Sequence, residues 1–281
     1  MQHIFKSYLK FLWNSTNAHG VHSPFVFNLV CKCFYDKTDF VEYKILKEYR
    51  NSLLLNKNTL QVTDFGAGSR IFKSDIRAIN KIAENAGISS KDAQLLFRIV
   101  NYFQSENILE IGTSLGLATS SLSLNDFAEV TTLEGCPNTM AIAKNQLQFR
   151  SQKFEKKINF VVTEFESYLK TLNLKHQTFD LIYFDGHHSK EATLNYFELL
   201  LTTISNETVW IFDDIHWSEG MEEAWEIIKK HSQVTVTIDT FQWGFVFFRK
   251  EQVKEHFIIR TSKSFLLDNL LGAKNLWGLL K

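Results

Sequence analysis

The chain has 281 residues, which is long enough for one α/β domain of ordinary size with an additional segment and a substantial core. Its 31 lysines and arginines balance its 31 aspartates and glutamates, which disfavours partners recruited by charge, such as nucleic acid or an anionic membrane. The three cysteines, Cys31, Cys33 and Cys136, form neither an even disulfide set nor a pair of C-x-x-C zinc motifs, so we expect free thiols in a reducing compartment.

Residues 1–90 are expected to form a helical N-terminal extension. Phe5, Tyr8, Leu9 and Leu12 recur at helical spacing near its start. Residues 1–20 have no continuous apolar run and no small-residue cleavage site, so we expect neither a signal peptide nor a membrane span and place the protein in the cytoplasm. We predict that the extension covers the substrate pocket.

Two glycine-containing segments interrupt this extension. In the segment 19–25, two histidines flank a glycine; they either line a substrate pocket or belong to an ordinary turn, and the turn is favoured. The segment 64–69, DFGAGS, mimics a cofactor-binding glycine loop. However, a mostly polar stretch precedes it, and the next acid, Glu84, lies in a helical pattern rather than after a strand. We interpret this segment as a loop of the extension and leave open whether it borders the active site.

From residue 107 onward, strand and helix patterns alternate, which favours a parallel sheet covered by helices on both faces. The predicted strands are 107–112, 129–134, 158–163, 179–185 and 207–213, and the predicted helices are 115–124, 138–150, 165–173, 190–204 and 219–231. Residues 233–241 and 243–250 then form two strand patterns with no room for a helix between them. They are expected to pair as an antiparallel hairpin. Together with the alternating strands and helices, this predicts an α/β fold with a Rossmann-like sheet that ends in a hairpin.

The segment 107–135 is the most informative part of the chain. It contains an apolar strand, a glycine-bracketed turn, a small-residue helix and a second strand that ends in Glu134. Glycines allow the backbone to approach a ligand, and an acid about 20 positions beyond Gly112 is placed to bind ribose hydroxyls. The turn lacks the middle glycine that brings backbone against a pyrophosphate. We therefore expect a nucleoside-containing cofactor without a pyrophosphate, against the alternative of an ordinary turn followed by a surface acid.

The motifs ILEIGTSLG and LEG resemble the first two motifs of class I S-adenosylmethionine-dependent methyltransferases. This resemblance implies S-adenosylmethionine as cofactor, with Glu134 on its ribose. The other cofactor-binding residues that it implies are Glu110, Gly112, Thr113, Ser114, Gly116, Gly135, Glu164 and Asp185. It also implies a seven-stranded sheet, made of the five parallel strands and the C-terminal hairpin.

The domain division follows from these patterns: extension 1–90, methyltransferase domain 91–255 and C-terminal helix 256–281. The last of these segments is apolar, but it is interrupted by Asp268, Lys274 and two glycines. This favours packing on the domain or on a second subunit over membrane attachment, so a homodimer is compatible with the sequence.

Polar clusters follow two of the predicted strands. Asp185 ends one strand, and Asp213 and Asp214 end the next. Ligands of open parallel sheets bind at the carboxyl ends of the strands, so these acids are expected beside the cofactor turn. Three carboxylates without a cysteine are hard oxygen ligands that suit Mg²⁺ or a related divalent cation. Alternatively, Asp213 and Asp214 cap the helix that follows them.

The same arrangement resembles the divalent-cation-dependent O-methyltransferases that act on catechols and on vicinal sugar hydroxyls. In that family the three positions hold the metal, although the catechol enzymes have an asparagine where this chain has Asp214. The resemblance also places the general base at His188, three residues after Asp185. A histidine near a cation stays neutral at physiological pH and can accept a proton. The alternative is that His187 and His188 are only turn residues.

We therefore expect a small-molecule O-methyltransferase with no nucleic-acid or membrane partner. Asp185 and His188 are the expected catalytic residues, and Asp185, Asp213 and Asp214 the expected metal ligands. The alternatives are a metal-independent methyltransferase that acts on nitrogen or RNA, and a protein that binds S-adenosylmethionine without catalysis.

Overall fold

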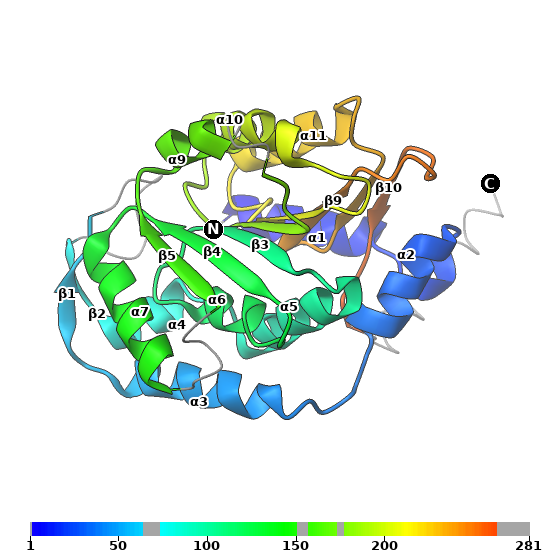
Figure 1. The fold of residues 1–281 in the computed structure, drawn as a ribbon. Helices are drawn as coiled ribbons and strands as arrows, with labels where there is room; N and C mark the ends of the chain where they lie inside the picture. The colour runs from blue at the N-terminus through cyan, green and yellow to red at the C-terminus, as the bar shows by residue number, and fades with distance from the viewer. Residues whose placement is uncertain (1, 64–73, 151–156, 173–176, 263–281) are drawn as a thin grey trace.

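The computed structural model describes residues 2–63, 74–150, 157–172 and 177–262, and the statements below refer to these residues. The glycine loop 64–69 and most of the expected C-terminal helix lie outside them. At the centre is a sheet with the strand order β10-β8-β9-β7-β6-β3-β4-β5 (Figure 1). Its strands are β3 (Asn107–Ile111), β4 (Glu129–Glu134), β5 (Ile158–Val162), β6 (Leu181–Phe184), β7 (Val209–Asp213), β8 (Val236–Asp239), β9 (Trp243–Phe247) and β10 (Glu255–Ile258).

The five parallel strands β3 to β7 and the antiparallel hairpin β8–β9 confirm the predicted α/β fold. The expectation of seven strands is wrong, because β10 adds an eighth strand parallel to β8. Residues 256–258, which were expected to begin a helix, therefore belong to the sheet. Their short pattern predicts no strand by itself, but the edge of β8 supplies backbone partners for it.

Helices follow the parallel strands as the alternating pattern predicts. Those that follow β3 to β7 are α6 (Leu117–Leu122), α7 (Pro137–Arg150), α9 (Phe165–Leu172), α10 (Lys190–Leu200) and α11 (Glu219–Lys230), while α5 (Ser90–Phe103) precedes β3. Serine hydroxyls cap three of them at the N-terminus: Ser89 on α5, Ser189 on α10 and Ser218 on α11. Figure 1 shows α9, α10 and α11 over one face of the sheet and α5 and α6 over the other.

The N-terminal extension contains α1 (Gln2–Asn14), α2 (Pro24–Leu29), a π-helical turn at Val30–Phe34, α3 (Glu42–Leu55) and α4 (Ile79–Asn85). It is not wholly helical, because β1 (Thr59–Gln61) and β2 (Ile76–Ala78) pair antiparallel in a separate small sheet. On α1 the predicted stripe is mostly exposed: Phe5 is 63% and Leu9 50% accessible, whereas Phe11 is buried. The helix is thus correct, but most of its predicted apolar stripe does not pack on the domain.

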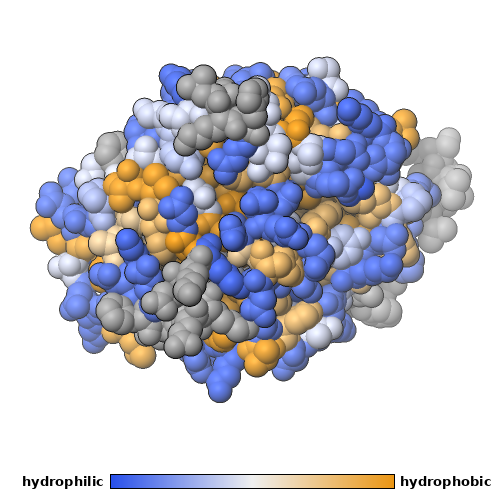
Figure 2. Space-filling view, viewed as in Figure 1, coloured by the Kyte–Doolittle hydropathy of each residue, from blue (hydrophilic) through white to orange (hydrophobic). Residues whose placement is uncertain are grey.

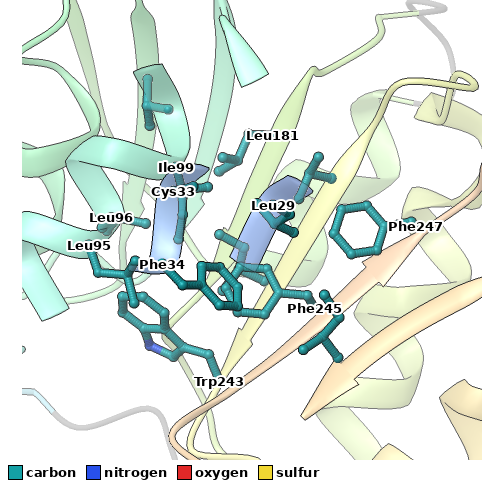
Figure 3. Packing of buried hydrophobic residues seen from close by; sticks show 14 of the residues in the cluster. Leu29, Cys33, Phe34, Leu95, Leu96, Ile99, Leu181, Trp243, Phe245 and Phe247 are labelled. Carbon is teal, nitrogen blue, oxygen red and sulfur yellow. The ribbon is translucent and has the colours of Figure 1, made fainter. Parts of the chain in front are cut away.

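The extension closes one face of the sheet. Leu29, Cys33 and Phe34 pack between α5 and the aromatic side chains of β9 (Figure 3). Phe34 lies 5.3 Å from Phe245, measured between ring centroids. The extension and the sheet therefore share one hydrophobic core, and removal of the extension would expose β9.

The outer surface has mixed character. Figure 2 shows hydrophilic and hydrophobic residues interspersed on the face drawn there. Within the described part of the chain, no helix has both the length and the apolar character needed to cross a bilayer.

Candidate active site

The site lies at the carboxyl ends of the central strands. Strand β3 is flanked by β4 on one side and β6 on the other, so the strand order reverses there, and crevices for ligands form at such points. A cavity of about 630 Å³ opens at this edge. The predicted site residues that line it are Gly112, Ser114, Glu134, Gly135, Glu164, Asp185, His188, Asp213 and Asp214.

The glycine turn after β3, residues 112–116, brings the backbone of Gly112 close to the backbone of Asp185. Gly112 has a φ of +105°, and a Cβ atom added there would lie 2.2 Å from the carbonyl oxygen of Asp185. Gly116 has a φ of +76°, and its Cβ would lie 3.1 Å from the Tyr49 hydroxyl oxygen. Both positions therefore favour glycine, and a larger residue at Gly112 would separate β3 from β6.

Glu134 stands at the end of β4 and faces the cavity. Its Oε2 accepts the N–H of Ser114 at 2.8 Å, and its Oε1 accepts the N–H of Cys136 at 2.9 Å. Burial raises the pKa of this carboxyl, although these backbone hydrogen bonds oppose the shift. Each oxygen keeps acceptor capacity, so the carboxylate can still receive hydrogen bonds from a bound diol.

Glu110 lies beneath the turn and is not among the cavity-lining residues. It is fully buried, and its Oε2 accepts the hydroxyls of Thr119 and Thr132, each at 2.5 Å. Burial raises the pKa of Glu110 to about 8, and Oε1 has no hydrogen-bond partner among the described residues. Thr113 joins this network through the hydroxyl of Thr132. Glu110 and Thr113 thus support the turn from below.

Glu164 lines the cavity beyond β5 and also caps α9. Its Oε2 accepts the backbone N–H of Ser167 at 2.8 Å and the hydroxyl of the same residue at 2.5 Å. The Ser167 hydroxyl contributes most to a lowered pKa of this carboxyl. The neighbouring Phe165 and Tyr196 also line the cavity and meet edge to face, with ring centroids 6.2 Å apart. Sequence reasoning missed this aromatic pair, because the two residues lie on different helices.

Asp185 and Asp213 lie side by side at the ends of β6 and β7, since Phe184 is paired with Phe212 one residue earlier. Burial raises the pKa of Asp213 to about 7, and the charge of Asp214 adds to the effect. Burial also raises the pKa of Asp185 well above its ordinary value, with further contributions from the charge of Asp213 and from a hydrogen bond between the two carboxyl groups. The structure therefore brings Asp185 beside Asp213 and Asp214, which lie far from it in the sequence.

Gln242 connects two of these acids. Its side-chain Nε2 donates to Asp213 Oδ1 and to Asp214 Oδ1, in both cases at 2.8 Å. It comes from the turn of the β8–β9 hairpin, and it also lines the cavity. Sequence reasoning missed it, because only the pairing of β9 with β7 places this turn beside the acids.

His188 lies in the same cavity, with its Nε2 3.6 Å from Asp185 Oδ1. Burial lowers the pKa of His188, and the charge of Asp214 partly opposes this shift. The neutral imidazole is therefore the favoured form, which is the form that can accept a proton. His187 has a φ of +57° and its Nδ1 lies 3.3 Å from the Ser189 hydroxyl, so it forms part of the turn into α10.

The extension supplies a wall of the cavity; the sequence predicts that it covers the pocket, but no motif identifies which of its residues do so. The lining residues from this part of the chain and from the start of α5 are Val62, Thr63, Arg77, Ile82, Asn85, Ala86, Gly87, Ile88, Ser89 and Asp92. Tyr49 ties α3 to the cofactor turn, because its hydroxyl donates to the carbonyl of Leu115 at 2.6 Å. The two histidines of the segment 19–25 are exposed and are not among the lining residues, as expected of an ordinary turn.

The three acids provide the right donor chemistry for a hard divalent cation. The carboxylates are crowded: the charge of Asp214 raises the pKa of Asp213, and the charges of Asp213 and Asp214 raise the pKa of Asp185, so a cation would relieve this repulsion. In their present positions, however, no three Asp, Glu, His or Cys side chains of the described residues are arranged to hold a metal. The donor chemistry of the three acids suits a cation, but the side chains would have to move to hold one.

Comparisons with known proteins agree with this geometry. Residues 109–215 match the family model of a methyltransferase domain, which spans the glycine turn and the three acids. A search of curated proteins finds no match to the chain.

Three solved structures illustrate the similarity of fold. The SAH-bound methyltransferase PaMTH1 of Podospora anserina is 13% identical, with a TM-score of 0.56 over 82% of this chain and 97% of its own. TomG of Streptomyces achromogenes, an O-methyltransferase in complex with SAM, is 15% identical, with a TM-score of 0.53 and coverages of 75% and 91%. The O-methyltransferase of Bacillus cereus in complex with SAH is 18% identical, with a TM-score of 0.50 and coverages of 75% and 90%. The chain therefore contains a methyltransferase domain, carried on the fold of the S-adenosylmethionine-dependent O-methyltransferases.

Proposed function

We propose that the protein transfers the methyl group of S-adenosylmethionine to a hydroxyl group of a small molecule. One observation carries this proposal: a single cavity is lined both by the cofactor turn with Glu134 and by the cluster of Asp185, His188 and Asp213. A methyl donor and an acceptor bound in the same cavity can be held in line for displacement.

The cofactor is bound by the part of the cavity that the glycine turn and Glu134 line. The glycine turn allows close approach of the nucleoside, and the remaining lone pairs of Glu134 accept its ribose hydroxyls. Ser114 occupies the position where a dinucleotide-binding turn has its middle glycine, which suits a cofactor without a pyrophosphate. Glu110 contributes indirectly, because it fixes α6 and β4 beneath the turn.

His188 acts as the general base. The acceptor oxygen attacks the sulfonium methyl group, the C–O bond forms as the C–S bond breaks, and S-adenosylhomocysteine leaves with the electron pair. The hydroxyl proton passes to the neutral imidazole of His188 and then to solvent. The protein contributes alignment and partial exclusion of water.

Asp185, Asp213 and Asp214 would hold the divalent cation implied by the family resemblance. When bound, such a cation lowers the pKa of a hydroxyl that contacts it.

A small acceptor fits the site better than a polymer does. The volume of about 630 Å³ has to hold the cofactor together with the acceptor, which leaves room for a small molecule. The balanced charge of the chain also offers no field for a nucleic acid.

The test is methyl transfer from radiolabelled S-adenosylmethionine to a panel of catechols and vicinal sugar diols, with and without excess chelator. We expect transfer to at least one diol class, and loss of transfer in chelator while calorimetry shows unchanged cofactor affinity. Transfer that persists in chelator would favour a metal-independent enzyme. Cofactor binding without transfer to any oxygen, nitrogen or RNA acceptor would favour a non-catalytic binding protein.

A further inference from the structure

The side-chain amide of Gln242 occupies the position between Asp213 and Asp214. Carboxylate oxygens accept hydrogen bonds and do not donate them when ionised, so the group that faces them is the NH₂ of the amide. Both of its N–H bonds are used, one on each acid, at 2.8 Å. This donor opposes the rise of the Asp213 pKa caused by burial and by Asp214. The amide therefore compensates part of the negative charge at this point.

Main-chain contacts hold Gln242 in this position. Beyond the last strand pair of Asp213 with Trp243, the N–H of Asp214 donates to the carbonyl of Gln242 at 2.9 Å. Asp214 has a φ of +54° and Phe241 a φ of +74°, although neither is a glycine. Such conformations are unfavourable and persist only where surrounding contacts enforce them, which often occurs at functional sites.

The enforcing contacts come from α1 and from the loop after β7. The Phe241 ring stacks on His216, with centroids 5.1 Å apart and an interplanar angle of 13°. The same ring meets Tyr8 of α1 at 4.9 Å between centroids and Phe11 at 5.5 Å. Asp239 completes the turn, because its Oδ1 accepts the Phe241 N–H at 2.8 Å and its Oδ2 lies 2.9 Å from His216 Nε2. The turn that carries Gln242 is thus packed between α1 and the loop after β7.

We propose that Gln242 closes the divalent-cation site of this protein. In the cation-free protein its amide bridges Asp213 and Asp214, and a cation has to displace the amide to reach them. The inference rests on the cation assigned under the proposed function. It explains why three suitable carboxylates line one cavity and yet are not arranged as a metal site in the described residues.

The experiment is a titration of the full-length protein with Mn²⁺, in which free Mn²⁺ is measured by electron paramagnetic resonance. The variants are Gln242→Ala and Gln242→Met; the second keeps most of the side-chain length but has no donor. The matched control is Gln233→Ala, at an exposed glutamine next to the hairpin. Because the wild type must break two hydrogen bonds to charged acceptors, both Gln242 variants should bind Mn²⁺ more tightly by at least about tenfold, and the control should match the wild type.

Equal or weaker Mn²⁺ binding by both Gln242 variants would overturn the inference. Absence of Mn²⁺ binding in every protein would overturn it together with the cation assignment. Calorimetry with S-adenosylhomocysteine on the same samples keeps the two proposals apart, because cofactor binding tests the methyltransferase site independently of the cation. It also shows that each variant is folded.

The wild type provides a test without any substitution. Addition of Mg²⁺ should shift the NMR resonances of the Gln242 side-chain NH₂, because its two acceptors are taken by the cation. Resonances that remain in place at saturating Mg²⁺ would contradict displacement.

Discussion

Replacement of Glu110 by glutamine should change how the stability of the protein depends on pH. Glu110 is fully buried, and burial raises its pKa from 4.5 to about 8. The folded protein therefore holds the proton more tightly than the unfolded chain does. Each pKa unit corresponds to about 1.4 kcal/mol, so the proton contributes on the order of 5 kcal/mol to the free energy of unfolding.

The sign follows from the raised pKa. The contribution is fully present below about pH 4.5, and it is lost as the pH rises through about 8. Glutamine has a similar shape, can still accept the hydroxyls of Thr119 and Thr132, and does not ionise. Its NH₂ takes the position of the unpartnered Oε1, which costs about 1–3 kcal/mol at every pH.

The assay is urea unfolding at pH values from 5 to 9 for the wild type and Glu110→Gln. At pH 5 the free energy of unfolding of the variant should equal or fall below that of the wild type. Between pH 5 and pH 9 the free energy of unfolding of the variant should rise by about 4 kcal/mol relative to that of the wild type. Glu129→Gln, at an exposed position of β4, controls for the loss of a surface carboxylate. Parallel curves for Glu110→Gln and the wild type would show that Glu110 is ionised in the folded protein and would refute the reasoning.

Three further predictions concern the cofactor and the base. Glu134→Ala should weaken S-adenosylmethionine binding by ~1.5–3 kcal/mol, because ribose loses a charged acceptor; unchanged affinity by calorimetry would contradict this. His188→Ala should lower the maximal rate ~10²–10⁴-fold with little change in S-adenosylhomocysteine affinity, and a rate near that of the wild type would exclude His188 as the base. Gly112→Ala should abolish cofactor binding, because its Cβ would lie 2.2 Å from the Asp185 carbonyl oxygen; cofactor binding retained by a folded variant would show that the turn adapts.

The sequence by itself determined the architecture of residues 107–250. Strand and helix periodicities are local properties, so the alternation of elements and the final hairpin could be predicted from the residue pattern. The turn after β3 was also predictable, because the glycine positions reflect backbone constraints that few other residues tolerate. Parallel strands present their carboxyl ends at one edge of the sheet, so the position of the polar residues at the strand ends beside the glycine turn could also be predicted.

Only the tertiary structure decided which side chains face the cavity. Glu110 belongs to the glycine motif, yet it faces α6 and β4 below the turn, whereas Glu134 faces the cavity. Gln242 reaches the acids because β9 pairs with β7, and β10 forms because β8 offers a free edge. These features depend on contacts between segments far apart in the chain, and a local pattern carries no information on the distance between such segments. The extension forms a wall of the cavity for the same reason: its side chains reach the cofactor turn only after α3 has packed against it.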